Sequence, residues 1–348
     1  MSASREAIIG AVRACDYFRR SPGRIGGPRG HKEWLHFCIS SGSVDLLINV
    51  SIVDDLRHDV HEHRELARLS VLWHDEGWEG AIQLYPSDEV RVVGGEIDAT
   101  IGPNRIYFED GVIVLRVRLP RPAIEVDLRL SPVTLPYLVS NIRGLDGRPI
   151  NWAVVPRSRA EGVLRLNGRT IEVTGALAYH DHNWGSFGWG NNFAWEWGYG
   201  LPADASNPWT VVFARLNSRG NTAALMQLFY LWRADRMLRT FRDHEIEVRR
   251  EGLLRPDRML KLPPAMGLVA PGLATDIPER LSIRAASRGD VIEAVFETEN
   301  VAQVIIPNDD DLGVTIINEV SGRLTMDGSA FGEPVHLDHR AVFEFLSA

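Results

Sequence analysis

The chain has 348 residues, 45% of them hydrophobic, so it is long enough for two domains of ordinary size and apolar enough to bury a core. Its net charge of −8 argues against a nucleic-acid-binding protein, because such proteins normally carry a basic face. No apolar run reaches the ~20 residues of an integral membrane segment.

The two cysteines, Cys15 and Cys38, are too few for a disulfide framework. They predict reduced thiols in a cytoplasmic protein. The N-terminal segment lacks the long apolar stretch of a secretory signal, which agrees with that location. The sequence assigns no oligomeric state.

Residues 4–19 are predicted to form a helix, because apolar residues recur there at three- and four-residue steps and Ser4 can serve as its N-cap. Glycine and proline interrupt any regular structure over residues 21–30. The apolar stripe of the helix consists of Ile8, Val12, Cys15 and Phe18.

The rest of the chain is predicted to be mostly β-structure, in short runs rich in branched and aromatic residues and bounded by turns. Asp110-Gly111, Asn167-Gly168 and Asp327-Gly328 are hairpin signals. Two longer loops are expected, at 54–66 and 254–279. The predicted strands are 34–40, 44–53, 81–85, 105–108, 112–119, 124–130, 162–166, 170–176, 193–199, 209–216, 223–232, 245–249, 281–286, 291–297, 313–324 and 342–345.

Many short strands without intervening helices predict an all-β protein built as sandwiches or barrels. We expect two β units of similar size that divide near residue 175. The predicted organisation is an N-terminal helix and linker over 1–30, a first β domain over 31–174 and a second β domain over 175–348.

The segment around residues 175–200 differs from the rest of the chain because it combines tryptophans with ionisable groups. It contains Trp184, Trp189, Trp195 and Trp197, four of the ten tryptophans. Alternation along a strand over 179–184 places side chains on two opposite faces. One face carries Tyr179, Asp181 and Asn183, and the other carries His180, His182 and Trp184.

Asp181 is the candidate general acid of this segment. A carboxyl group between a phenol and an amide, with aromatic rings around it, is expected to have a raised pKa and to donate a proton near neutral pH. Tyr179, His180 and His182 are the candidate groups that orient it or the attacking water. The alternative is structural: the same side chains can satisfy buried backbone groups. A register slip of one residue would also reverse the two faces.

The pair His180 and His182 also fits half of a zinc site, but no third ligand follows at a recognisable spacing, so no metal is predicted. Neither a Gly-rich phosphate loop nor a GxSxG elbow occurs, and no cofactor is predicted.

Several large side chains are candidates for substrate binding, with core packing as the alternative for each of them. Trp195 and Trp197 alternate with Glu196, so both rings share one strand face, where they can pack a core or stabilise a cation through their π faces. Glu319, a carboxylate among apolar neighbours, is a secondary candidate. The substrate-binding set is Trp152, Asn183, Trp184, Trp195, Glu196 and Trp197.

The run from Tyr179 to Gly185, preceded by Gly175 and followed by Trp195-Glu196-Trp197, resembles the signature of the carotenoid 1,2-hydratase (hydroxyneurosporene synthase) or AttH-like family. Trp152 with Pro156, and Glu33-Trp34, fit the same pattern. The resemblance extends from about residue 31 to residue 345. The N-terminal helix and the loop at 254–279 have no counterpart in it.

This resemblance implies two lipocalin-like antiparallel β-barrel or sandwich units packed together. Members of the family include hydratases of isoprenoid or prenylated alkenes and natural-product cyclases of the Diels–Alder type. The residues that match Trp152, Tyr179 and Asp181 are those associated with activity in the hydratases, where the aspartate is thought to protonate an isolated double bond.

Three functions follow, all with a lipophilic small molecule as partner. The first is a lyase or isomerase that protonates an isoprenoid, terpenoid or carotenoid-type alkene, and thus acts as a hydratase, isomerase or cyclase. The second is a pericyclase of secondary metabolism, which folds a polyene without an obligatory proton donor. The third is a carrier that binds a lipophilic ligand without chemistry.

Overall fold

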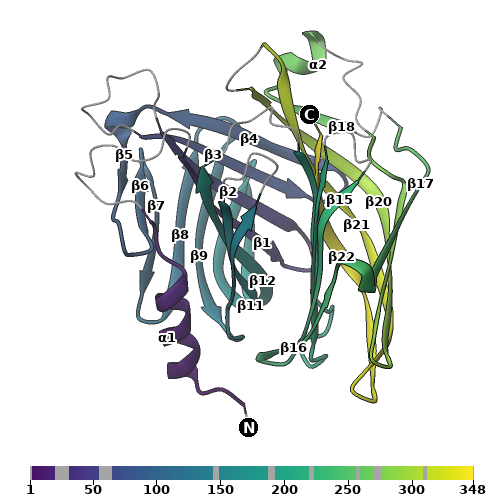
Figure 1. The fold of residues 1–348 in the computed structure, drawn as a ribbon. Helices are drawn as coiled ribbons and strands as arrows, with labels where there is room; N and C mark the ends of the chain where they lie inside the picture. The colour runs from purple at the N-terminus through teal and green to yellow at the C-terminus, as the bar shows by residue number, and fades with distance from the viewer. Residues whose placement is uncertain are drawn as a thin grey trace. The chain divides into compact units, whose positions relative to one another are not determined.

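A computed structural model of the chain describes residues 2–19, 31–54, 65–143, 149–186, 193–218, 223–255, 259–269, 276–308 and 312–347. The described chain forms two compact units (Figure 1). The first comprises Met1–Asp75 and Gly80–Phe187, and the second comprises Glu76–Glu79 and Gly188–Ala348. Trp189 and the expected linker at 21–30 lie outside the described residues.

The first unit contains one helix and a sheet of 12 strands in the order β4-β3-β2-β1-β12-β11-β9-β8-β7-β6-β5, with β10 paired to β11. Residues of β3 and β5 approach each other, so the sheet curls towards a barrel. Its elements are α1 (Arg5–Cys15), β1 (His31–Ser40), β2 (Asp45–Asp54), β3 (Glu65–His74), β4 (Trp78–Tyr85), η1 (Ser87–Glu89), β5 (Val90–Val92), β6 (Asp98–Ile101), β7 (Asn104–Glu109), β8 (Val112–Leu119), β9 (Ile124–Pro132), β10 (Tyr137–Arg143), β11 (Pro149–Leu166) and β12 (Arg169–Ser186).

The second unit contains a sheet of 10 strands in the order β16-β15-β14-β13-β22-β21-β20-β19-β17, with β18 parallel to β20. All its other strand pairs are antiparallel. Its elements are β13 (Phe193–Gly200), β14 (Trp209–Ser218), β15 (Ala224–Arg233), β16 (Arg236–Arg242), η2 (Asp243–Glu245), β17 (Ile246–Glu251), β18 (Met259–Leu262), α2 (Ala265–Val269), β19 (Arg280–Ser287), β20 (Asp290–Pro307), β21 (Val314–Ala330) and β22 (Glu333–Ser347).

The all-β fold class and the short N-terminal helix are therefore confirmed. Each unit has its own hydrophobic core, and Val12 and Phe18 contribute to the core of the first. Among the residues placed by the structure, no helix combines the length and the apolar character needed to cross a membrane.

Helix α1 begins as the sequence predicts, because the Ser4 side chain accepts a hydrogen bond from the Ala7 N–H. It ends at Cys15 rather than at residue 19. Asp16 leaves the helical conformation, and the backbone of Phe18 then pairs with that of Gly95 and Glu96. The predicted helix was thus too long, because its last apolar residue packs from an extended segment.

Two of the three hairpin signals are confirmed. Asp110-Gly111 joins β7 to β8, and Asn167-Gly168 joins β11 to β12, with positive φ at all four residues. Asp327-Gly328 does not form a turn, because both residues lie inside β21. A Cβ atom on Gly328 would lie 2.1 Å from the carbonyl oxygen of Val291, so this glycine permits a close approach of β20 instead.

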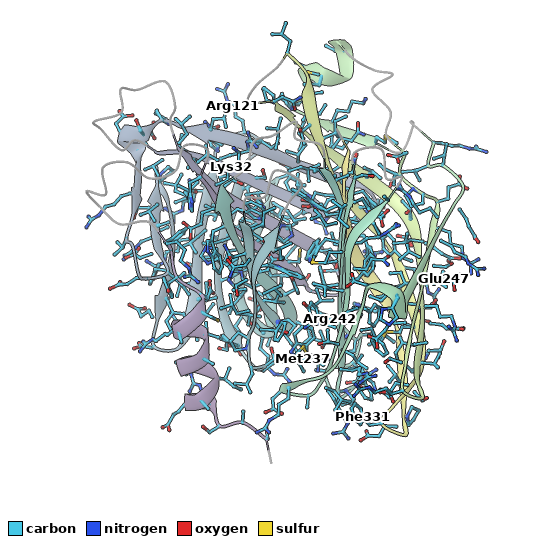
Figure 2. The ribbon with its side chains drawn as sticks, in the orientation of Figure 1. Lys32, Arg121, Met237, Arg242, Glu247 and Phe331 are labelled. Atoms are coloured by element: carbon cyan, nitrogen blue, oxygen red, sulfur yellow. The ribbon has the colours of Figure 1, made fainter. Side chains whose placement is uncertain are left out.

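The turn between β21 and β22 lies at Phe331-Gly332, where Figure 2 labels Phe331. Phe331 has a φ of 52° and is 61% exposed, and its N–H donates to Asp290 Oδ1 at 2.8 Å. A phenylalanine at positive φ is uncommon, so propensity alone does not predict this turn.

Several strands were not predicted. Of β11, which has 18 residues, only 162–166 was expected. The pairing of β11 with β12 shifts register between Val155 and Ser158, so a bulge accommodates this segment. The expected loop at 54–66 ends in β3, and its residues 55–64 lie outside the described residues. The expected loop at 254–279 contains β18 and α2.

The boundary expected at residue 175 falls within β12. The complete strand belongs to the first unit, and it pairs with β1 and β11 there. This strand carries the run from Tyr179 to Trp184.

Candidate functional site

Asp181 lies on β12 with its neighbours at alternate positions. Tyr179 Oη donates a hydrogen bond to Asp181 Oδ2 at 2.7 Å, and Asn183 Nδ2 donates to Asp181 Oδ1 at 2.8 Å. Asp181 is 3% exposed. Because side chains two residues apart share a strand face, this geometry is the one that alternation predicts. Both carboxyl oxygens are therefore held in a defined orientation.

Neighbouring strands add two side chains to the Asp181 face. Trp152 of β11 lies opposite Asn183, and its indole donates a further hydrogen bond to Asp181. His36 of β1 lies directly opposite Asp181. Residues directly opposite in an antiparallel pair point to the same face, with Cβ atoms about 5 Å apart. The sequence placed Trp152 among the binding residues and did not identify His36.

His36 is a neutral imidazole in this environment. Asn49 Nδ2 donates to His36 Nδ1 at 3.3 Å, so the ring hydrogen is on Nε2, which lies 3.1 Å from Cys38 Sγ. Burial, together with the nearby His180, lowers the pKa of His36 to about 3. No signal within the strand over residues 34–40 shows that this histidine lies opposite Asp181, because strand register is a long-range property.

Burial raises the pKa of Asp181 to about 6. The hydrogen bonds from Tyr179 and Trp152 oppose this rise, as does the charge of the two neighbouring histidines. Among the described residues, Asp181 forms no ion pair. A carboxyl group with a pKa of about 6 is half protonated near pH 6 and about one tenth protonated at pH 7, so it can donate a proton in that range.

His180 and His182 point to the other face of β12, which is the core face of the first unit. His180 Nε2 lies 2.9 Å from Asp16 Oδ2, and His182 Nδ1 lies 2.8 Å from Asp16 Oδ1. His182 Nε2 lies 2.8 Å from Glu33 Oε1. None of these four side chains is exposed by more than 1%. The structure thus separates the two histidines from Asp181.

His182 is charged because it lies between two carboxylates. Burial alone would lower its pKa, but the hydrogen bonds to Asp16 and Glu33 outweigh burial and raise it to about 9. Burial would likewise raise the pKa values of the two acids, yet the histidines hold that of Asp16 well below its usual range and lower that of Glu33 to about 2.

These contacts also bear on the zinc alternative. His180 Nδ1 faces the carbonyl oxygen of His36 at 2.9 Å, so each of the four ring nitrogens of His180 and His182 has a hydrogen-bond acceptor. A metal ion needs a nitrogen lone pair, which a nitrogen that donates a hydrogen bond does not offer. The chemistry of this pair therefore fits an ion-pair network better than a zinc site.

Trp184 packs against Arg19. The guanidinium carbon of Arg19 lies 3.9 Å from the centre of the Trp184 ring and 3.5 Å from that of Tyr17. Arg19 also donates to the carbonyl oxygens of Cys15 and Tyr17. Trp184 therefore anchors the segment after α1 through cation–π stacking.

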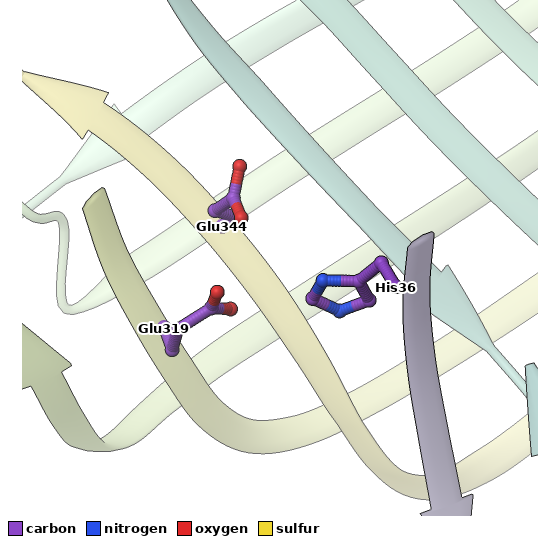
Figure 3. A group of neighbouring side chains, drawn as sticks. All are labelled: His36, Glu319 and Glu344. Carbon is purple, nitrogen blue, oxygen red and sulfur yellow. The ribbon is translucent and has the colours of Figure 1, made fainter. Parts of the chain in front are cut away.

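The second unit carries the other predicted aromatic residues on β13. Trp195 Nε1 donates to Glu344 Oε1, and the rings of Trp197 and Tyr199 lie 5.8 Å apart. Glu344 of β22 lies directly opposite Trp197 and directly opposite Glu319 of β21. Figure 3 shows the two glutamates, which have carboxylate oxygens within 4.8 Å of each other.

Glu196 points to the other face of β13, where Phe343 and Phe345 pack in the core. It is 1% exposed and forms ion pairs of 3.1 Å with Arg215 and with Arg250. The hypothesis that Glu196 binds substrate therefore competes with a structural role inside the second unit.

The first unit also contains a cavity of about 690 Å³ near the end of α1. Its lining includes Asp16, Arg13 and Tyr107 but not Asp181. It lies beside the histidine network rather than at the candidate acid.

Comparison with known proteins adds a likeness of fold. No protein-family model matches the chain, and no curated protein matches its sequence. Among solved structures, a protein assigned as an AttH from Nitrosomonas europaea is 13% identical with a TM-score of 0.66, over 95% of this chain and 97% of that one. Kievitone hydratase from Nectria haematococca is 12% identical with a TM-score of 0.56, over 96% of each chain.

A third similar structure is CghA in complex with Sch210972, which is 12% identical with a TM-score of 0.54, over 96% of this chain and 94% of that one. At this level of identity the likeness establishes a shared fold. It confirms, for the fold, the resemblance noted in the sequence.

Proposed function

We propose that the protein is an enzyme that protonates a carbon–carbon double bond in a lipophilic small molecule, with Asp181 as the general acid. The observation that carries this proposal is a carboxyl group that is 3% exposed, has a pKa of about 6 and is oriented by Tyr179 and Asn183. The fold shared with kievitone hydratase supports it.

The reaction begins when the Asp181 O–H bond breaks and a C–H bond forms on the alkene, which leaves a carbocation and a carboxylate. Water then adds to the cation and returns a proton to Asp181, so that the net change is addition of water. If the cation instead loses a proton from a neighbouring carbon, the product is an isomer. The Trp152 ring, on the face of Asp181, can stabilise the cation by about 2 kcal/mol when water is excluded.

Solvent deuterium tests this reaction. We expect kievitone, or a linear isoprenoid alkene, incubated with the enzyme in D₂O to gain one carbon-bound deuterium per turnover. Mass spectrometry and NMR of the product locate the label, and incubation without enzyme is the control. Turnover without carbon-bound deuterium contradicts the proposal.

A pericyclic cyclisation is the second candidate, because the chain also shares its fold with CghA, a Diels–Alderase. In that reaction Asp181 would donate a hydrogen bond to an activating carbonyl and no proton would reach carbon. Turnover of a polyene without deuterium incorporation supports this candidate.

The pH dependence of turnover provides a further prediction. The active form of Asp181 is protonated, so turnover is expected to fall about tenfold per pH unit above a pKa of about 6. Tyr179→Phe removes a hydrogen bond that lowers this pKa, so the falling limb should move to higher pH. A pH–rate profile measures both effects, with Tyr107→Phe as the control. A limb that does not move in Tyr179→Phe contradicts the assignment.

A further inference from the structure

The buried network on the reverse face of β12 joins three elements of the first unit. Asp16 follows α1, Glu33 lies on β1, and the two histidines lie on β12. Asp16 contacts one nitrogen of each histidine, and Glu33 contacts the remaining nitrogen of His182. The residues in contact are separated by up to 166 positions in the sequence, so the network forms only when the unit folds.

The hydrogen-bond partners define how the network is held. The carbonyl oxygen that faces His180 Nδ1 can only accept, so this nitrogen carries a hydrogen. Both nitrogens of His182 face carboxylates, and these contacts raise its pKa to about 9, so His182 is an imidazolium. The buried carboxylates of Asp16 and Glu33 thus have hydrogen-bonding and charged partners, which is the condition under which buried charges are tolerated.

His180 and His182 flank Asp181 in the sequence, so the network acts on the strand segment that presents the acid. A slip of β12 by one residue would turn Asp181 towards the core and the histidines away from their acids. The pairing of β1 with β12 runs without a register shift from His31 to Ser40. The ion pairs favour this register because any other leaves charges buried without partners.

We propose that Asp16 and Glu33 are positioning residues for Asp181: by holding His180 and a charged His182 on the core face of β12, they fix the strand face that presents the acid and set the charge behind it. The proposal depends on the proposed function only in treating Asp181 as the acid.

Other charged groups near the network support the same arrangement. The backbone N–H of Arg19 donates to Glu33 Oε1 at 2.9 Å, and His31 Nε2 lies 3.5 Å from Glu33 Oε2. The Arg19 guanidinium stacks on Trp184. On the other face of β12, His36 lies opposite Asp181. The positive charge of His180 and His182 lowers the pKa of Asp181 and so limits the rise that burial causes.

Asp16→Asn tests the proposal without substrate. An amide carries no charge to stabilise the His182 imidazolium, so the His182 pKa falls, positive charge behind Asp181 is reduced and the Asp181 pKa is expected to rise by about one unit. Carbon-13 NMR of labelled aspartate side chains measures the pKa. The Asp181 signal is the one that the spectrum of the Asp181→Asn variant lacks. The control is Glu109→Gln, which removes one negative charge from an exposed site of the same unit.

If Asp16→Asn folds and the pKa of Asp181 is unchanged or lower, the proposal is overturned. A loss of stability alone does not raise the pKa of Asp181 in the folded protein. Glu33→Gln, which leaves both Asp16 contacts in place, is the second variant and should shift the pKa in the same direction by less. Nitrogen-15 NMR of the wild-type protein at pH 7 needs no variant, and a neutral His182 ring also overturns the proposal.

These measurements separate the inference from the proposed function. A rise in the Asp181 pKa in Asp16→Asn stands even if deuterium never enters the product. Conversely, if deuterium enters the product but the Asp181 pKa is unchanged in Asp16→Asn, the proposed function is supported and the positioning role of Asp16 is contradicted.

Discussion

Asp181→Asn is expected to reduce alkene protonation by about 10³-fold or more, because general acid catalysis by one positioned group contributes about 10²–10⁴-fold and the amide has no proton to give. The substitution preserves shape and volume, and Tyr179 and Asn183 can still hydrogen-bond the amide. We therefore expect the free energy of unfolding to change by no more than about 1 kcal/mol. Single-turnover rates and chemical denaturation measure the two quantities.

Asp127→Asn is the matched control for Asp181→Asn, because Asp127 is an exposed aspartate on β9 of the same unit. It should leave both the rate and the stability unchanged. If Asp181→Asn retains most of the wild-type rate, Asp181 is not the proton donor. Either the reaction is then pericyclic or another group is the acid.

The part of this site that sequence predicts is the part that local geometry determines. The alternation of Tyr179, Asp181 and Asn183 depends only on the two-residue period of a strand, and the start of α1 depends on Ser4 and a helical apolar period. The raised pKa of Asp181 follows from burial among aromatic residues, which composition alone suggests.

The remaining features depend on contacts between distant segments. Asp16 meets His180 across 164 positions, and His36 meets Asp181 because of the register between β1 and β12. Neither follows from a pattern within one strand. Asp327-Gly328 fails as a turn for a related reason, because the approach of β20 to Gly328 is decided by sheet packing.

Glu196 and Glu344 of the second unit also show that contacts between distant segments are not predictable from a local pattern. Glu196 and Glu344 both belong to strands with large aromatic residues, yet Glu196 points to the core with two arginines and Glu344 accepts from Trp195 on the other face. The arginine partners come from β14 and β17, which no spacing around Glu196 indicates.

Glu196→Gln is expected to destabilise the protein by about 3 kcal/mol, because removing one partner of a buried ion pair leaves the other charge uncompensated. Glu196 is 1% exposed, and the side chains of Arg215 and Arg250 are 15% and 21% exposed. The Arg215 guanidinium would then lie largely out of water without its carboxylate, whereas Arg250 keeps Asp276 at 3.5 Å. Urea denaturation followed by tryptophan fluorescence measures the change in the free energy of unfolding.

Glu333→Gln is the matched control in the same unit, because Glu333 pairs with Arg233 at 2.7 Å while both side chains are nearly half exposed. Exposed pairs contribute at most about 1 kcal/mol, so the control should lie near wild type. If Glu196→Gln instead unfolds like wild type but loses turnover, the carboxylate acts on substrate and the structural role is wrong. If stability falls and the folded fraction retains its rate, Glu196 belongs to the framework of the second unit, and the proposed chemistry depends on the Asp181 face alone.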